Sequence, residues 1–172
     1  MRIRITKGAK DDAIEALRDD GSRMATRVGH KGPVPHDVTH LMVERALGMS
    51  DGFWGKVARG AQPEDLGAMA KSAGHASAKR AELPDPTIVE IVKAERIVES
   101  FEADLWSNGS DDESVRSMAD AGCGQSLVPP VAMSDAEIAT IRADLRAFRD
   151  RWAALGEGES VDFDWVEAVP GA

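Results

Sequence analysis

The sequence contains little cysteine and no long apolar run, and each absence excludes a class of protein. Cys123 is the single cysteine, so no disulfide can form within the chain. Because no apolar run approaches the roughly 18 residues that cross a bilayer, membrane insertion is excluded. The first four residues include two arginines and lack the apolar core of a signal peptide. These absences predict a cytoplasmic protein.

Positive charge is scarce in the C-terminal two-thirds of the chain. The formal net charge is −9, with nine Lys and Arg against seven Asp and Glu in residues 1–50 but 12 against 23 in residues 51–172. An acidic surface repels phosphate, so nucleic acid and anionic membranes are excluded as the main partners. An unknown small molecule, including a cationic one, or another protein remains open as the partner.

Length and composition predict one globular domain. A chain of 172 residues suffices for one hydrophobic core and is short for two, and its apolar and charged fractions of 42% and 30% are near globular averages. We therefore expect a single α+β domain over residues 1–172. A small antiparallel sheet from N-terminal strands and a C-terminal strand is expected to pack with about five helices.

Alternation of apolar and polar residues predicts the strands. Ile3 and Ile5 alternate with arginines near the N-terminus, and Val161, Phe163 and Trp165 alternate with aspartates near the C-terminus. The expected strands cover about residues 2–6, 13–18, 23–28 and 160–166.

The Asp-Gly pair at residues 20–21 predicts a hairpin between the second and third of these strands, because it supplies the positive φ angles of a tight turn. Pairing across the turn is expected to set Leu17 beside Met24. The opposite face carries three arginines, and we expect it to be solvated. They are Arg18, Arg23 and Arg27.

Capping boxes, prolines and glycines mark the helices. A Ser or Thr followed three residues later by Glu satisfies backbone donors at a helix start. This pattern pairs Thr87 with Glu90, Ser110 with Glu113, and Ser134 with Glu137. Pro35 suits a first helical turn and Gly48 a left-handed C-terminal cap, so one helix is expected between them. The expected helices cover about residues 35–47, 51–59, 63–82, 86–106 and 134–155.

Two histidines and a glutamate recur every four residues in the first of these helices. At about 100° per residue, His36, His40 and Glu44 fall on one polar stripe with Asp37 beside it, at the margin of the apolar face. Two imidazoles four residues apart can converge on one metal ion, as they do in the helix of metalloproteases. We therefore predict a divalent metal site for zinc, iron or manganese, with both histidines and Glu44 as ligands.

Further ligands are expected from the helix predicted at residues 86–106. Glu95, Glu99 and Glu102 line the edge of its apolar face at helical spacing. Glutamate and histidine side chains on facing helices form metal sites in helical bundles. The predicted ligand set therefore adds Glu95 and Glu102, and the predicted chemistry is metal-dependent hydrolysis or a lyase reaction.

Other interpretations of the histidine stripe stay open. His36 and Asp37 can simply occupy a helix N-terminus, where an acidic residue favours the helix dipole, while His40 and Glu44 form a solvated pair. Alternatively, His40 acts as a general base oriented by Asp37 or Glu44 without a metal. For the whole chain, the opposing hypothesis is a non-catalytic protein-interaction domain with an acidic surface.

Two large aromatic residues, Phe53 and Trp54, stand between glycines directly after the histidine helix. They are either core anchors or the apolar wall of a ligand pocket beside His40. No spacing ties Cys123 to a base, so we expect it to be an inert apolar residue. His75, among small neighbours, is expected to be exposed.

The sequence Pro-His-Asp-Val-Thr-His at residues 35–40, with Glu44 and the Gly-Phe-Trp-Gly run at residues 52–55, resembles a family of small uncharacterised bacterial proteins. The likeness covers roughly residues 20–60, and it implies a shared fold without indicating a chemistry.

His36, Asp37 and His40 are also similar to the His-Asp-x-x-His zinc motif of the coenzyme Q biosynthesis family. That motif implies a zinc site completed by a glutamate about a dozen residues later. In this sequence the residue twelve positions after His40 is Gly52.

Overall fold

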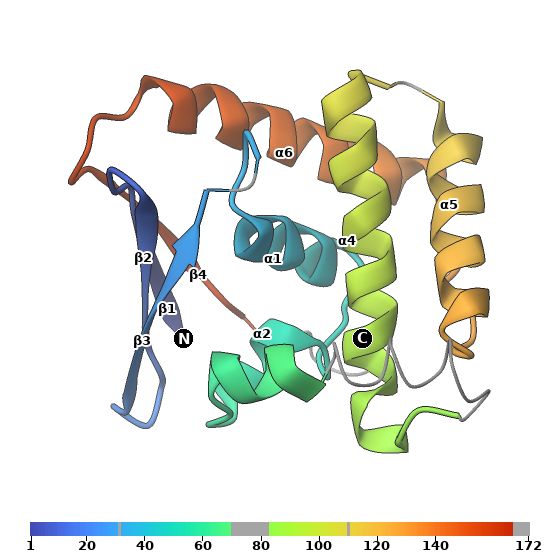
Figure 1. The fold of residues 1–172 in the computed structure, drawn as a ribbon, viewed down its shortest axis with the longest axis horizontal. Helices are drawn as coiled ribbons and strands as arrows, with labels where there is room; N and C mark the ends of the chain where they lie inside the picture. Colours follow the sequence, from blue (N-terminus) through green and yellow to red (C-terminus); the bar gives the residue numbers. More distant parts are fainter. Residues whose placement is uncertain (31, 70–82, 110, 167–172) are drawn as a thin grey trace.

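Four short strands form an antiparallel sheet at one end of the molecule (Figure 1). The computed structural model describes residues 1–30, 32–69, 83–109 and 111–166. The strands are β1 (Arg2–Thr6), β2 (Asp11–Leu17), β3 (Arg23–Gly29) and β4 (Ser160–Asp164), in the order β3-β2-β1-β4. The C-terminal strand thus pairs with the N-terminal one, and the predicted α+β class is confirmed.

The register of the β2–β3 hairpin differs from the prediction. Met24 lies opposite Ala16, whereas the sequence pattern had set it beside Leu17. The backbone N–H of Arg18 donates to the carbonyl of Ser22 at 2.9 Å, so the whole segment between these residues forms the connection. Loop length determines hairpin register, and this connection moves the pairing by one residue.

The prediction of a solvated arginine face is wrong for Arg18, which is 5% exposed. Its guanidinium donates to the carbonyls of Val57, at 2.5 Å, and Ala61, at 3.0 Å. These carbonyls lie at and just beyond the end of helix α2 (Phe53–Ala58), where backbone acceptors lack partners within the helix. A buried cation is therefore satisfied by the helix end, while Arg23 and Arg27 are exposed as expected.

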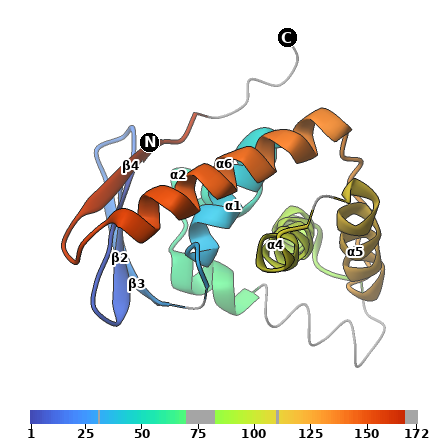
Figure 2. The ribbon, with the colours of Figure 1, turned by 90° about the horizontal axis from the view of Figure 1, so that it is seen from above.

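The helices pack on one side of the sheet (Figure 2). Besides α2 they are α1 (His36–Ala46), the 3-10 turn η1 (Pro86–Ile88), α4 (Val89–Ser107), α5 (Asp112–Gln125) and α6 (Asp135–Ala154). Residues 63–69 are also helical, whereas the rest of the helix predicted at 63–82, with His75, lies outside the described residues. In Figure 1, α6 runs from the neighbourhood of α4 and α5 across to the sheet.

One of the predicted capping boxes is present in the structure and another is not. Ser134 and Glu137 form the full capping box of α6, as predicted. The box of Thr87 and Glu90 is wrong, because Asp85 caps this start by accepting from the Thr87 N–H at 2.8 Å. The Glu90 carboxylate accepts instead from the backbone N–H of another residue, Asp51, at 2.9 Å.

Helix α5 was not among the predicted helices. Its N-terminal cap is Asp111, which accepts from the Glu113 N–H at 3.1 Å, and Ser110 of the predicted box lies outside the described residues. The buried side is a narrow stripe of Val115, Ala119 and Cys123 packed beside α4. With so few apolar residues, the stripe gives a weak periodic signal.

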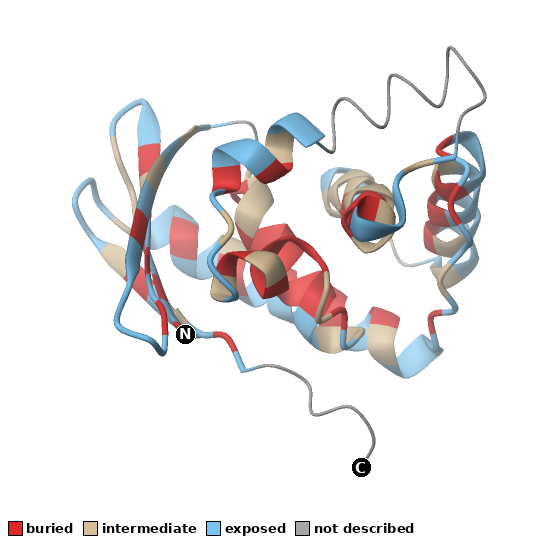
Figure 3. Cartoon of the chain, turned by 90° about the horizontal axis from the view of Figure 1, so that it is seen from below, coloured by how far each residue is buried: buried red, intermediate tan, exposed pale blue. Residues whose placement is uncertain are grey.

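Helix α1 occupies the centre of the molecule and packs against α2, α4 and α6. All of its residues from Val38 to Glu44 are buried, as the red ribbon in Figure 3 illustrates. The sequence had placed the histidine stripe at the margin of the buried face, but only His36 is half-exposed. In the described ranges, no helix combines the length and apolar character that a membrane span needs.

Candidate metal centre

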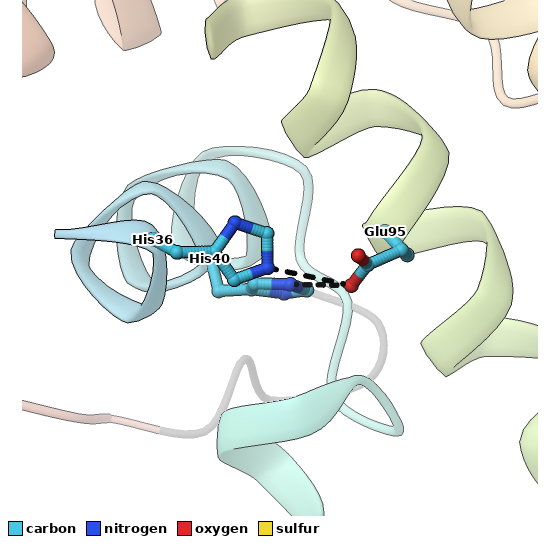
Figure 4. Close-up of side chains that lie close together, drawn as sticks. All are labelled: His36, His40 and Glu95. Carbon is cyan, nitrogen blue, oxygen red and sulfur yellow. Dashed lines mark hydrogen bonds and ion pairs between the residues drawn. The ribbon is translucent and has the colours of Figure 1, made fainter. Parts of the chain in front are cut away.

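Two histidines of α1 point toward one glutamate of α4 (Figure 4). The Glu95 Oε2 atom lies 3.1 Å from His40 Nε2 and 3.5 Å from His36 Nε2. Among the described residues, this trio is the group whose ligand atoms, one from each residue, all lie within 4.8 Å of one another. His36, His40 and Glu95 therefore form a group that could hold a metal ion.

Local backbone geometry presents the two histidines. Pro35 is the N-terminal cap of α1, with φ −57° and ψ 136°, so the helix begins one residue later than predicted. Beyond its end, Gly48 adopts the expected left-handed conformation with φ 64°. The rings of His36 and His40, one helical turn apart, lie 4.8 Å apart in an edge-to-face arrangement.

The other ring nitrogen of each histidine contacts a different carboxylate. His40 Nδ1 lies 3.0 Å from Glu44 Oε1, and His36 Nδ1 lies 2.9 Å from Glu102 Oε1. A carboxylate on the far nitrogen fixes the tautomer and orientation of a metal-binding imidazole. Glu44 and Glu102, predicted as direct ligands, thus lie where they hold the rings, and Glu95 alone faces both Nε2 atoms.

Glu44 is fully buried, and its carboxylate is held from three directions. Besides the His40 contact, Oε1 accepts from the Phe53 N–H at 3.0 Å and Oε2 from the Trp54 N–H at 2.9 Å. These N–H groups begin α2, so a negative charge lies at the positive end of that helix. A Cβ atom at Gly52 would lie 2.7 Å from the carboxylate, so a side chain at this position would force Glu44 to shift.

Phe53 and Trp54 are core residues. They are 9% and 0% exposed, and neither is among the described residues that line a cavity of about 80 Å³ beside His36. The Phe53 ring packs 5.6 Å from the His40 ring, and Trp54 Nε1 donates to the Asp37 carbonyl at 2.8 Å. Of the two interpretations of this aromatic pair, the structure favours core anchors that also brace α1.

Asp37 neighbours His36 in α1 and is not part of the group that could hold a metal ion. Burial raises the pKa of its carboxyl, against the opposing influence of the His40 and His36 charges. A carboxyl with a raised pKa is suited to holding a proton. The structure thus leaves the predicted acid–base role of Asp37 open and gives His40 a closer carboxylate partner, Glu44.

The carboxylates govern the charge of both rings. Desolvation, the largest influence, lowers the histidine pKa values, but hydrogen bonds to glutamates outweigh it. The pKa of His36 is raised to about 10 by Glu102 and Glu95, and that of His40 to about 9 by Glu44 and Glu95. Burial acts to raise the pKa of Glu95, yet the two histidines hold it well below its ordinary value. Without a metal, both rings are therefore in the positively charged imidazolium form at neutral pH.

The contact between Glu44 and His40 was among the open interpretations of the sequence, although the predicted metal site had made Glu44 a direct ligand. A glutamate four residues after a histidine on one helix is placed to contact that histidine directly. The contact with Glu102 had no such signal, because it joins α1 to α4 across 66 positions of sequence.

Cys123 is fully buried against α4, and burial raises the pKa of its thiol. Both observations agree with the expectation of an inert residue.

Comparison with known proteins gives no further guide to this site: no family model, no curated protein and no solved structure matches the chain.

Proposed function

We propose that this protein binds a divalent transition-metal ion through His36 Nε2, His40 Nε2 and the Glu95 carboxylate. One observation carries the proposal: both Nε2 atoms converge on one Glu95 oxygen, while a separate glutamate holds each Nδ1 atom. A chance pair of surface histidines has no reason to be supported in this way on both rings.

The distances suit an ion of ordinary size. Zinc bonds to nitrogen and oxygen of about 2.0–2.1 Å set tetrahedral ligand atoms about 3.3 Å apart. The two nitrogen-to-oxygen distances of 3.1 Å and 3.5 Å bracket this value. Binding therefore requires only small side-chain adjustments, within a group already spanning no more than 4.8 Å.

The donor set favours zinc or iron(II) over manganese. Two imidazoles and one carboxylate are the protein ligands of one class of catalytic zinc sites and of many non-haem iron sites, and both kinds of site keep a position open for substrate. Manganese prefers a site built mainly from oxygen atoms. A site with two imidazole nitrogens and one carboxylate thus ranks zinc and iron(II) first.

Metal-dependent hydrolysis or a lyase reaction is the activity proposed for this centre. The ion would supply a Lewis acid that polarises a substrate oxygen. Glu44 and Glu102 keep both Nε2 atoms directed at the centre, and Asp37, whose pKa is raised by burial, is the proposed proton carrier. His40 and Glu44 are buried, with side chains 4% and 0% exposed, so water is excluded from one side of the site.

Metal analysis of protein purified without a histidine tag tests the proposal. We expect close to one equivalent of zinc or iron after loading and dialysis, and a higher melting temperature with the ion than without it. His36→Ala and His40→Ala should lose both effects. His30→Ala is the matched control, because His30 pairs with Asp12 at 2.7 Å, away from the centre.

Two glutamate variants test the assignment of Glu95 as a metal ligand. Glu95→Gln should lower metal affinity at least tenfold, whereas Glu99→Gln on the same helix should leave it unchanged, because Glu99 pairs with Arg96 at 2.7 Å. Equal effects of the two substitutions would contradict the ligand set. If the protein retains no metal after loading, the metal proposal fails and the alternative hypothesis of a non-catalytic protein-interaction domain is favoured.

A further inference from the structure

A cavity of about 80 Å³ borders the candidate metal centre. It shares His36 with the centre, and Glu102, the hydrogen-bond partner of His36, also lines it. Apolar side chains cover most of the remainder, among them Val34, Leu105 and Trp106. The cavity therefore combines one acidic end with an apolar wall.

One oxygen of the Glu102 carboxylate is available to accept a hydrogen bond from a ligand. Glu102 Oε1 faces His36 Nδ1, and within the described part of the chain Oε2 has no hydrogen-bond partner. No lysine or arginine occurs among the described residues that line the cavity. The basic group among these lining residues is His36, which already pairs with Glu102 Oε1. Because Glu44 and Glu95 also face the two histidines, three carboxylates surround two imidazoles, and this charge favours a neutral or positive ligand over an anion.

Two other lining residues point to a ligand. Thr39 is 1% exposed, and its Oγ1 atom is buried with no hydrogen-bond partner among the described residues. Buried hydroxyls are normally hydrogen-bonded, so this exception needs an explanation. Trp106, which also lines the cavity, is 69% exposed, which is unusual for a large aromatic residue. An exposed indole beside a carboxylate is a combination that recognises organic cations.

We propose that this cavity binds a primary ammonium group carrying a short alkyl chain, as the recognition element of the substrate. The ammonium group donates to Glu102, and the alkyl chain lies against Val34, Leu105 and the Trp106 ring. This inference rests on the proposed metal centre, which it supplies with a class of substrate: a small aliphatic amine whose reacting oxygen extends toward His36.

The cavity volume limits the alkyl chain. A closed cavity of about 150 Å³ accommodates the six carbons of benzene, so a space of about 80 Å³ takes about three non-hydrogen atoms: the ammonium nitrogen and two carbons. Because Trp106 is exposed, a longer ligand extends outward past its ring. The n-butylammonium ion is thus a suitable probe.

NMR titration of metal-free protein and of zinc-loaded protein tests the proposal. We expect n-butylammonium to shift the Trp106 indole N–H and the backbone amide of Gly32, which also lines the cavity, with a Kd of about 1 mM. A Trp106→Phe variant identifies the indole resonance among the four tryptophans. Butyrate and 1-butanol, of similar length, should bind at least about tenfold more weakly.

Three variants measure how much individual side chains contribute to the affinity for n-butylammonium. Glu102→Gln should weaken n-butylammonium about tenfold, and Trp106→Ala, at an exposed position, about fivefold, read from the Gly32 amide. Glu99→Gln, one turn away on the same helix face, should leave the affinity unchanged. Absence of a shift with about 10 mM n-butylammonium, or equal binding of butyrate, overturns the proposal.

Metal and amine are titrated separately, so the two proposals fail independently. Zinc binding without n-butylammonium binding rejects the pocket and leaves the metal centre standing. Binding of n-butylammonium by protein that takes up no metal rejects the metal centre and supports the pocket as an amine site alone.

Discussion

His40 and Glu44 are joined by a hydrogen bond of 3.0 Å across one turn of α1, and their side chains are only 4% and 0% exposed. A buried pair of opposite charges is unfavourable unless its remaining hydrogen-bonding capacity is satisfied. Here Glu95 meets the second nitrogen of His40, and two backbone N–H groups of α2 meet the Glu44 carboxylate. The pair thereby links α1, α2 and α4 at the candidate centre.

Replacing Glu44 should therefore destabilise the whole fold. Glu44→Ala removes the acceptor of the Phe53 and Trp54 N–H groups and leaves the His40 ring with one carboxylate fewer. We expect a loss of about 3–5 kcal/mol in the free energy of unfolding, measured by urea denaturation. Glu99→Ala is the control, with an expected change within about 0.5 kcal/mol. A similar loss in both variants would contradict the central role of Glu44.

Gly52→Ala should also destabilise the protein, through a steric effect on the same carboxylate. The added Cβ would lie 2.7 Å from Glu44 atoms that are fixed by three hydrogen bonds, so the carboxylate cannot move aside freely. We expect a loss of about 1–3 kcal/mol. Gly124→Ala in α5 meets open space and should be neutral or slightly stabilising. Thermal denaturation of the two variants in parallel makes the comparison.

Metal affinity should rise steeply with pH. In the metal-free protein, the pKa values of about 10 for His36 and about 9 for His40 mean that both rings are protonated at neutral pH. The ion must displace both protons, whereas Glu95, with its lowered pKa, is already ionised. Affinity should increase about 100-fold per pH unit between about pH 6 and 8. Competition with a chelating dye measures it, with His30→Ala as a control that should keep the slope. A flat profile would show that the rings are not ligands.

A buried ion pair between α4 and α6 should matter more than the exposed pair on the sheet. The Arg142 guanidinium donates to both Asp104 oxygens at 2.9 Å, and the two side chains are 10% and 8% exposed. Asp104→Asn leaves the buried Arg142 cation with Asp112 as its carboxylate partner among the described residues, so we expect a loss of about 1–3 kcal/mol. Asp162→Asn breaks the exposed pair with Arg4 and should cost less than about 1 kcal/mol. Urea unfolding curves distinguish these outcomes.

Much of the local structure follows from sequence periodicity. The alternation around Ile3 and Val161 predicts β1 and β4, and Pro35 with Gly48 delimits α1 to within a residue or two. These predictions succeed because the period of side chains along a strand or helix is a property of the backbone alone. The failures have local causes too: a connection longer than a tight turn shifts the β2–β3 register, and α5 buries too narrow a stripe to be recognised.

The presence of His36 and His40 on one face of a helix was determined by the sequence itself, because a four-residue spacing leaves no other arrangement in an α-helix. Which glutamate faces which nitrogen was decided only by the tertiary structure. Glu95 contacts His40 across 55 positions of sequence, and Glu102 contacts His36 across 66. The position of α4 against α1 depends on how the whole core packs, and no local pattern encodes that distance or the burial of Glu44.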